Sequence, residues 1–592
     1  MIKISLFSFG MFIKANKASG ILCFIFEILA RIVGVVDFLI IAKIIDVVVK
    51  ILQNNSSIEL VVPYLIFLVG FNFIASCIRR TRNYYRNKSS QYFSFYSDVF
   101  LYEYYKTLGV PVMEDPDKNN IITRGMNEIG QLPNLFFTFV GVIADVINVV
   151  IAGIAIFYFM PKLLLVAIIW MVINNIPEIF FVKEMYQYGF NNTEARRLNN
   201  RVIGYILGKV NLIELSIHNS AEYLKKKFLS FIEVYLTGWL KIRKKAYVWR
   251  TGFSLFNIFV YFWMMLNIIG KIVKDKLSIG RLYFYISMIE RFEDNLDGLF
   301  ADITALYEMA LKIDDTYKFF NLKPSFEDGK IELKEFKNPP EIVCEHVNFK
   351  YPNTERLIFK DLNLRIKAGE KLAIVGVNGA GKTTLIKLLL RFYQTTDGDI
   401  LINNQNIDDL MIKTYYRNVG TLFQDFGEYQ ALTAGENIYL GDTSKDKNDK
   451  KIREAAKKAD ADDFINLYTN KYEQILSEAF KGGIRPSTDQ WQRIAISRLF
   501  YRNPWLVIFD EPTASIDAEA EYKIFNNIYE FFNNKTVIII SHRFSTVRNA
   551  DRIILIDEGH IVEEGSHDEL IKLDGKYAKA FRLQAEGYEI KS

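Results

Sequence analysis

Residues Lys371–Leu390 read KLAIVGVNGAGKTTLIKLLL, a strand candidate, a glycine-rich loop and a helix candidate in succession. Within this stretch, Gly376–Thr383 matches the phosphate-binding pattern G-x-x-x-x-G-K-[ST], in the strand and helix context that the motif requires. The glycines let backbone N–H groups turn toward phosphate oxygens at the start of the helix, which we expect over Thr384–Leu390. Lys382 would then reach the β- and γ-phosphates, and the Thr383 hydroxyl would ligate Mg²⁺. A chance glycine turn is the alternative, and the flanking elements argue against it.

A carboxylate pair follows a second apolar run, because Leu506–Glu511 reads LVIFDE. The apolar residues predict a buried strand whose end presents Asp510 to a bound metal ion. Glu511 would polarise a water molecule in line with the γ-phosphate. A pair of capping or surface carboxylates is the alternative, but its combination with a phosphate-binding loop favours a nucleotide-hydrolysing site.

Short apolar runs alternate with helical stretches in residues 341–592, which predicts an α/β domain with a largely parallel sheet. The charged stretch Lys323–Pro340 ends in two prolines and is expected to be a linker between residues 1–322 and residues 341–592. The expected strands are Lys371–Val375, Trp505–Phe509, Thr536–Ile540 and Arg552–Ile556.

The first half contains six apolar runs long enough to cross a bilayer, which requires about 20 residues per helix. Two long connections between them are rich in Arg and Lys, and the positive-inside rule places both in the cytoplasm with the N-terminus. Lys271, Lys274 and Lys276 oppose this topology, because they fall on the predicted outer side. The expected spans are Ile21–Val48, Leu60–Ile78, Leu135–Met160, Leu163–Val182, Gly252–Val273 and Leu277–Phe300, of which the last is interrupted by charged residues.

Composition excludes several classes of protein. With 50% hydrophobic and 24% charged residues, the 592-residue chain is too apolar to be disordered and too charged for a membrane bundle alone. Its net charge of +5 lacks the strong basic excess of a nucleic-acid binder. Three cysteines, distant in sequence, exclude a disulfide scaffold, and five histidines without a clustered pair argue against a transition-metal centre.

Membrane spans followed by this loop and this carboxylate pair resemble an ATP-binding cassette transporter of the exporter type. The resemblance implies a six-helix transmembrane domain followed by an α/β P-loop NTPase domain, in a half-transporter that must dimerise. It also implies ATP and Mg²⁺ as cofactors, with Glu511 and His542 as catalytic residues. The implied nucleotide-binding residues are Tyr351, Gly376, Val377, Asn378, Gly379, Ala380, Gly381, Lys382, Thr383, Thr384, Gln424, Ser487, Gln490 and Asp517, and the implied metal ligands are Thr383, Gln424 and Asp510.

Single residues outside the loop carry part of this resemblance. Tyr351 in FKYP matches the aromatic residue that stacks on adenine, although a tyrosine there can also belong to the core. Gln424 in TLFQD matches the glutamine that contacts Mg²⁺ and couples the cassette to the membrane half. Ala514–Asp517 resembles the loop that crosses the dimer interface, and His542 matches the histidine that contacts the γ-phosphate.

The membrane half adds weaker expectations. Val112–Pro116 resembles the first intracellular coupling segment, and Asn211–Ser220 lies where the second should be. Glu27 and Arg31 are four residues apart in the first span and are expected to pair on one helix face. Ionisable residues within spans usually face a cavity or a partner, and here acidic residues predominate, which favours a cationic peptide or amphiphile as substrate. These acids are Asp37, Asp145 and Glu178, with the alternative that they lie in cytoplasmic extensions of the helices.

The chain departs from the family at the signature, usually Leu-Ser-Gly-Gly-Gln, because Pro486–Gln490 reads PSTDQ and lacks both glycines. In the family this segment lies against the γ-phosphate held by the partner's P-loop, where glycine permits a close approach. Thr488 adds bulk and Asp489 adds a negative charge. At about 5 Å and an effective dielectric constant near 20, a like-charge pair costs roughly 3 kcal/mol. A role for Asp489 as the cap of the following helix is the milder interpretation.

The intact P-loop beside a defective signature predicts a heterodimer, in which a second half-transporter supplies a sound signature to this chain's ATP. A homodimer is the alternative and should hydrolyse ATP slowly at both sites. Export across the plasma membrane, with the cassette in the cytoplasm, is the default for this architecture, and the Lys-, Ile- and Asn-rich composition indicates a bacterial source. An importer with the exporter fold and an ATP-gated channel or sensor are the alternatives, and the intact Glu511 argues for turnover.

Overall fold

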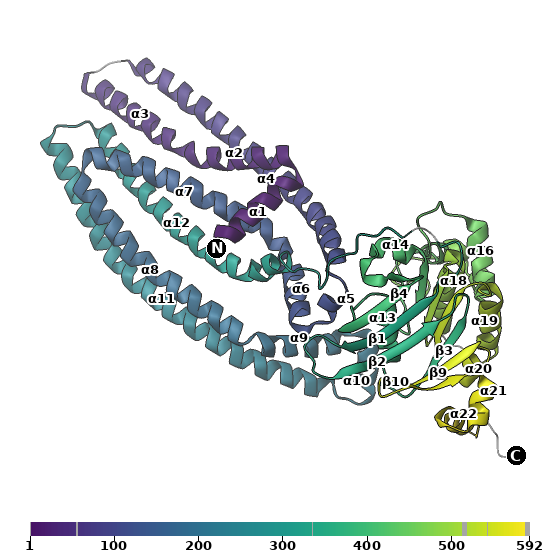
Figure 1. Cartoon of the computed structure of the whole chain (residues 1–592). Helices are drawn as coiled ribbons and strands as arrows, with labels where there is room; N and C mark the ends of the chain where they lie inside the picture. The colour runs from purple at the N-terminus through teal and green to yellow at the C-terminus, as the bar shows by residue number, and fades with distance from the viewer. Residues whose placement is uncertain (1, 55–56, 334–335, 512–517, 542, 587–592) are drawn as a thin grey trace. The chain divides into compact units, whose positions relative to one another are not determined.

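The computed structural model describes residues 2–54, 57–333, 336–511, 518–541 and 543–586. These residues form two compact units (Figure 1). Each unit has its own hydrophobic cores. The first comprises Met1–Thr107 and Pro116–Leu322, and the second comprises Lys323–Ser592 together with Leu108–Asp115. The short segment Leu108–Asp115 therefore belongs to the second unit, although the chain on both sides of it belongs to the first.

Within the described residues of the first unit, all regular secondary structure is helical. Its cores combine aliphatic and aromatic side chains. In one of them, Phe12 stacks on Phe136 with ring centroids 4.0 Å apart. The helices are α1 (Ile2–Ala15), α2 (Lys17–Ile32), α3 (Gly34–Asn54), α4 (Val62–Leu108), α6 (Pro116–Glu128), α7 (Leu132–Phe159), α8 (Pro161–Asn191), α9 (Thr193–Leu207), α10 (Lys209–Ile217), α11 (Ala221–Lys274) and α12 (Ile279–Phe319).

Three helical segments of the described chain are long and apolar enough to cross a bilayer. They are Ile58–Leu108, Pro116–Phe159 and Ala221–Lys274. They contain the second and fifth predicted spans and all of the third except Met160. The first predicted span lies on α2–α3 and the sixth on α12, and both spans contain several charged residues. The fourth lies on α8, where the described apolar stretch is the shorter Pro161–Trp170. For the first, fourth and sixth spans, a membrane crossing therefore remains a prediction.

The predicted pairing of Glu27 with Arg31 is wrong. Arg31 instead forms an ion pair with Asp145 of α7 at 2.6 Å and lies 3.6 Å from Asp302 of α12, while Glu27 lies 3.6 Å from Arg86 of α4. Spacing of four residues makes a pair possible on an isolated helix, but α2 packs against α7, and that contact offers Arg31 a mostly buried carboxylate. Tertiary packing therefore overrides the local spacing.

The second unit contains the parallel sheet that the sequence predicts. Its strands are β3 (Lys371–Val375), β6 (Val419–Leu422), β7 (Leu506–Asp510), β8 (Thr536–Ile540), β9 (Arg552–Asp557) and β10 (His560–Gly565), in the order β10-β9-β3-β8-β7-β6, with only β10 antiparallel to its neighbour. A second, antiparallel sheet joins β1 (Ile342–Lys350), β2 (Leu357–Ile366), β4 (Asp397–Ile402) and β5 (Gln405–Asn406) in the order β2-β1-β4-β5.

The second unit also contains helices. They are α5 (Val110–Glu114), α13 (Lys382–Leu389), α14 (Ile412–Arg417), α15 (Ala434–Tyr439), α16 (Asp449–Lys458), α17 (Asp462–Leu467), α18 (Thr488–Arg502), α19 (Ala518–Phe531), α20 (Phe544–Val547), α21 (His567–Leu573) and α22 (Lys576–Glu586).

The sheet register places the phosphate-binding loop and the carboxylate pair at one edge. Ile374 on β3 and Asp510 on β7 both pair with Ile540 on the intervening strand β8. The two strands are therefore about 10 Å apart, twice the usual spacing of neighbouring strands, and end at the same level. The residues that follow them face the same space at the carboxyl end of the sheet, where open α/β sheets bind ligands.

Candidate active site

The phosphate-binding loop depends on glycine at defined positions. Gly381 caps α13 with φ at +108°, and a Cβ added there would lie 2.9 Å from the ring of Phe359. A Cβ on Gly376 would lie 2.3 Å from the carbonyl oxygen of Ile556. Neither position accepts a side chain, because both its backbone angle and its neighbours exclude one. The loop therefore presents main-chain groups at the N-terminus of α13, as an anion-binding loop requires.

Lys382 is buried within this loop, with 6% of its surface exposed. Its ammonium group donates hydrogen bonds to the carbonyl oxygens of Gly376 at 2.9 Å and Val377 at 3.1 Å. Burial lowers the pKa of Lys382, while the carboxylates of Glu511 and Asp510 oppose that shift. The loop thus holds a cation close to two carboxylates, at the place where phosphate oxygens would bind.

A cavity of about 610 Å³ lies beside this loop. It is lined by Tyr351, Arg356, Ile358, Asn378, Gly379, Gly381, Lys382, Thr383, Thr384, Gln424 and Glu511. The structure therefore brings most of the predicted nucleotide-binding residues to one cavity, together with the predicted catalytic carboxylate. Three other loop residues, Gly376, Val377 and Ala380, do not line it.

Tyr351 occupies one wall of the cavity and is fixed by its neighbours. Its hydroxyl lies 2.9 Å from the Thr384 hydroxyl, and its ring meets those of Phe349 and Tyr393 edge-on. These contacts hold the phenol in place beside the phosphate-binding helix. An aromatic ring at this distance from the loop can carry the base of a nucleotide whose phosphates lie on the loop.

Two cavity residues are missing from the sequence-based predictions, Arg356 and Ile358. Both follow Tyr351 by a few residues, in the turn before β2 and at its start. The sequence offered one signal for them, since a cation and an apolar residue follow shortly after the predicted base-stacking tyrosine. The signal is weak, because an exposed arginine in a turn is common at any protein surface.

Glu511 directly follows β7 and has φ at +50°, in the left-handed region that non-glycine residues rarely adopt. Its backbone N–H donates a hydrogen bond of 2.9 Å to the carbonyl oxygen of Ile540, which continues the β7–β8 ladder by one residue. This conformation turns the chain sharply, while the carboxylate lines the cavity. Strain of this kind is typical of functional positions. Asp510, the last residue of β7, is buried.

The oxygen donors of the cavity fit a magnesium ion bound with a nucleotide. Thr383 and Gln424 line the cavity, and Asp510 ends the adjacent strand. Mg²⁺ prefers hard oxygen ligands, and in phosphate sites it takes only one or two from the protein, the rest being phosphates and waters. Within the described ranges, no group of three His, Cys, Asp or Glu side chains could hold a metal ion alone.

The predicted signature residues lie away from this cavity. Ser487 is the N-cap of α18, and it exchanges hydrogen bonds with Gln490 in a capping box. Asp489 is therefore not the cap, which corrects the milder interpretation of this residue. Its carboxylate instead pairs with Arg493 one turn later, at 2.9 Å. Two further predicted residues, Asp517 and His542, lie outside the described residues.

The resemblance of Val112–Pro116 to a coupling segment falls on α5, which is part of the second unit. The Glu114 carboxylate accepts hydrogen bonds from Lys387, at 2.6 Å, and from the Tyr393 hydroxyl. Burial alone would raise the pKa of Glu114, but these two donors lower it below its ordinary value. Lys387 lies on α13, so α5 contacts the helix that begins at the phosphate-binding loop.

Comparison with known proteins agrees with this geometry. The family described as ABC transporter matches residues 359–514. The chain is 27% identical to the subtilin transport ATP-binding protein SpaT of Bacillus subtilis, over 94% of the chain and 90% of that protein. It is 34% identical to the beta-(1-->2)glucan export ATP-binding/permease protein NdvA of Bartonella bacilliformis, a match that spans 52% of the chain and 51% of the relative. A solved bacterial Atm1-family ABC exporter with ATP bound has the same fold, with a TM-score of 0.76 and 22% identity over 96% of the chain and 98% of that structure.

Proposed function

The chain is an ABC transporter with the exporter fold, and from that premise we propose that it drives export across a bacterial membrane by hydrolysing ATP between two associated cassettes. The observation that carries this proposal is the single cavity at the carboxyl end of the parallel sheet. It combines a phosphate-binding loop, an aromatic wall and a carboxylate, in a chain whose other half is a bundle of long apolar helices.

The predicted residues of the site have proposed roles. The glycine loop and Lys382 bind the phosphates, and Tyr351 carries the adenine base. Glu511 orients and deprotonates the attacking water, while Thr383, Gln424 and Asp510 hold Mg²⁺, which would neutralise charge on the phosphates. His542 and Asp517 are proposed from the sequence alone, as residues that complete the site near the γ-phosphate and at the dimer interface.

We propose that α5 transmits the state of the cassette to the membrane helices. The segment is joined covalently to helices of the first unit at both ends, yet its Glu114 is bonded to Lys387 and Tyr393 in the second. A movement of α13 with nucleotide would therefore move α5. The corresponding role of Asn211–Ser220 rests on sequence position.

The favoured assembly is a heterodimer with a second half-transporter. The P-loop and Glu511 are complete, whereas the signature Pro486–Gln490 lacks both glycines. A partner with a sound signature would serve this chain's ATP, and the partner's ATP would turn over slowly against Thr488 and Asp489. A homodimer, with two defective sites, is the second possibility.

The proposed substrate is a peptide or another amphiphile. The relative that matches along most of the chain transports subtilin, which supports a peptide. The acidic residues of the predicted spans favour a cationic substrate. Two acidic residues of the spans already have a cation beside them, since Asp145 is paired with Arg31 and Glu27 lies beside Arg86, and these two therefore add little to that argument. Export is preferred to import because relatives with this architecture are named as exporters. Coupled hydrolysis is preferred to an ATP-gated channel or sensor because Glu511 lines the cavity.

The test is Mg-ATP hydrolysis by the full chain, purified alone in lipid nanodiscs, with Glu511→Gln as the blank. We expect the chain alone to hydrolyse ATP at a rate close to the blank. Once a second half-transporter is co-expressed, we expect ATP-dependent uptake of subtilin into inside-out vesicles. Robust turnover by the chain alone would reject the heterodimer. ATP binding without hydrolysis in every assembly would favour the channel or sensor.

A further inference from the structure

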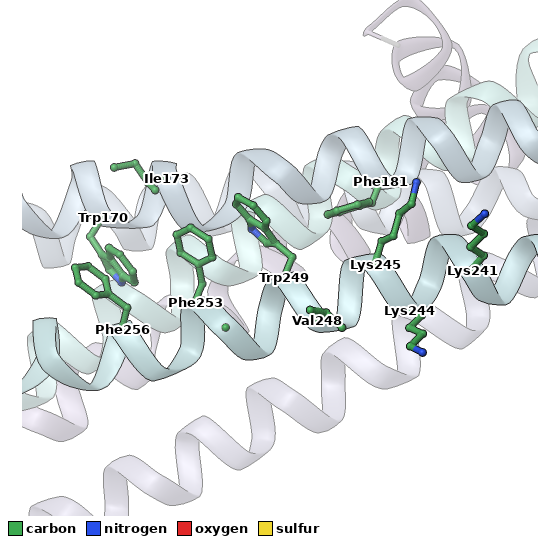
Figure 2. A pocket seen from close by; sticks show the side chains of 11 residues that line it. Trp170, Ile173, Phe181, Lys241, Lys244, Lys245, Val248, Trp249, Phe253 and Phe256 are labelled. Atoms are coloured by element: carbon green, nitrogen blue, oxygen red, sulfur yellow. The ribbon is translucent and has the colours of Figure 1, made fainter.

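A groove between α8 and α11 is the largest cavity of the first unit among those described, at about 1150 Å³. Figure 2 shows its lining, with aromatic side chains toward one end and lysines toward the other. The two helices run side by side along their length (Figure 1). We propose that this groove binds an anionic membrane lipid, with its headgroup on the lysines and its acyl chains along the aromatic rings.

The lining on α11 follows the helical period. Lys241, Lys245, Trp249, Phe253 and Phe256 are separated by four, four, four and three residues, so they form one stripe along the helix. The stripe spans about 22 Å at 1.5 Å per residue, and its lysines lie at one end. A lipid with an acidic headgroup has the same polarity along its length.

The aromatic end of the groove is a continuous apolar surface. Trp249 stacks on Phe253 with ring centroids 4.5 Å apart, and Trp170 of α8 meets Phe256 at 4.8 Å. Trp249 is 39% exposed and Phe256 is 56% exposed, so these rings can still bury surface against a ligand. Apolar area of this kind favours acyl chains.

The basic end carries charge that the described chain does not neutralise. Lys245 pairs with Glu184 at 3.2 Å. Among the side chains that the structure describes, no carboxylate pairs with Lys241 or Lys244. Lys241, which points toward α8, is therefore available to a phosphate, and Lys244 adds positive charge from the other side of α11 (Figure 2). Lysine is depleted from the centres of protein–protein interfaces, which argues against a second protein chain as the occupant.

The position of the groove matches the depth of a lipid headgroup. Gly252 begins the fifth predicted span, and the lysines precede it on the side assigned to the cytoplasm. Tryptophan is enriched at this boundary, and basic pockets between membrane helices on the cytoplasmic side bind anionic headgroups. Along α11, lysine, tryptophan and phenylalanine therefore follow one another in the same order as the headgroups, the interface and the hydrocarbon core of a bilayer.

Gly252 leaves the floor of the groove open. A Cβ added there meets no atom within 4 Å, so a larger side chain would occupy the space of a ligand rather than disturb the helix. A Cβ added to Gly270 also meets no atom within 4 Å, but Gly270 lies on the same helix outside this groove. The two glycines therefore provide a matched pair of substitutions.

The experiment titrates the detergent-solubilised full chain with phosphatidylglycerol or phosphatidylcholine of equal acyl chains and counts bound lipid by native mass spectrometry. We expect phosphatidylglycerol to bind at least tenfold more tightly. Lys241→Gln with Lys244→Gln should remove most of that preference, about fivefold for each lysine. The matched double variant Lys226→Gln with Lys227→Gln, farther along α11, should leave it unchanged.

Two further arms identify the occupant. Gly252→Leu should reduce retention of both lipids, and Gly270→Leu should not. Equal binding of the two lipids, or a preference that survives removal of Lys241 and Lys244, would overturn the proposal. Competition by inorganic phosphate as strong as that by the lipid would show an anion site without a lipid and would also overturn it. Lipid binding needs no nucleotide, so the result is independent of ATP hydrolysis.

Discussion

Glu511 combines a strained backbone with a place on the wall of the nucleotide cavity. Replacing it with Gln keeps the shape and removes the base. We expect Mg-ATP hydrolysis by an active assembly to fall by a factor of about 10²–10⁴, the usual contribution of a general base, while ATP binding persists. Phosphate release and binding of a fluorescent ATP analogue measure the two quantities. Glu454→Gln, on the exposed face of α16, is the control. Equal loss in both variants would contradict a catalytic role.

Tyr351 allows its ring to be separated from its hydroxyl. Tyr351→Phe removes the 2.9 Å contact with Thr384 but keeps the aromatic wall, so we expect ATP affinity within about twofold of the wild type. Tyr351→Ala removes the stacking surface, which is worth about 1–3 kcal/mol per base, so affinity should fall by about fivefold or more. Calorimetric titration with ATP measures both. If the phenylalanine variant loses as much as the alanine variant, the hydroxyl and not the ring governs binding.

The residues of the cavity were predictable to the extent that contiguous motifs encode them. Gly379, Gly381, Lys382 and Thr383 form one loop, and the register of β3, β8 and β7 brings Glu511 to it. The pairing of Arg31 with Asp145 was not predictable, because it depends on how α2 and α7 meet. Arg356 was not found either, because its position beside the loop is set by the turn between β1 and β2.

At the scale of elements, buried parallel strands were the easiest to predict. The four expected strands agree with β3, β7, β8 and β9 to within one residue at each end, because strands buried on both faces are continuous apolar runs. The antiparallel sheet of β1, β2, β4 and β5 was not predicted. Its strands alternate buried and exposed residues, and β1 is further disturbed by register shifts after Cys344 and Val347.

The short helix α5 has a testable attachment. Glu114→Gln weakens the bond to Lys387, which is a partly exposed charged contact worth about 1 kcal/mol. We expect the amide protons of Val110–Glu114 to exchange about fivefold faster, as measured by hydrogen–deuterium exchange of the full chain at neutral pH. Glu103→Gln, on the exposed surface of α4, is the control. Unchanged exchange in the Glu114 variant would show that the buried Pro111 and Val112 hold α5 without the ion pair.

At the scale of the whole molecule, the question is how far the altered signature limits hydrolysis. Asp489 pairs with Arg493 at 2.9 Å. The other partner of Arg493, Asp460, also pairs with Lys523, so two cations balance two carboxylates and a phosphate facing α18 would meet a largely compensated Asp489. The repulsion should therefore be much smaller than the roughly 3 kcal/mol of an unpaired charge at about 5 Å. The remaining obstacle is the bulk of Thr488 and Asp489 where the family has glycine.

Two sets of substitutions separate the effect of charge from the effect of bulk in the chain assembled alone in nanodiscs. Asp489→Asn should raise ATP turnover less than threefold, because Arg493 already offsets the charge. Thr488→Gly with Asp489→Gly should raise it at least tenfold, because only glycine permits backbone contact with a phosphate held by a second copy. The glycine pair also costs up to about 1 kcal/mol of helix stability per residue, so a melting curve accompanies each assay. Full rescue by Asp489→Asn would show that the charge governs the defect. If neither variant raises turnover and both remain folded, the chain does not form a working dimer with itself, and only a different half-transporter can complete its site.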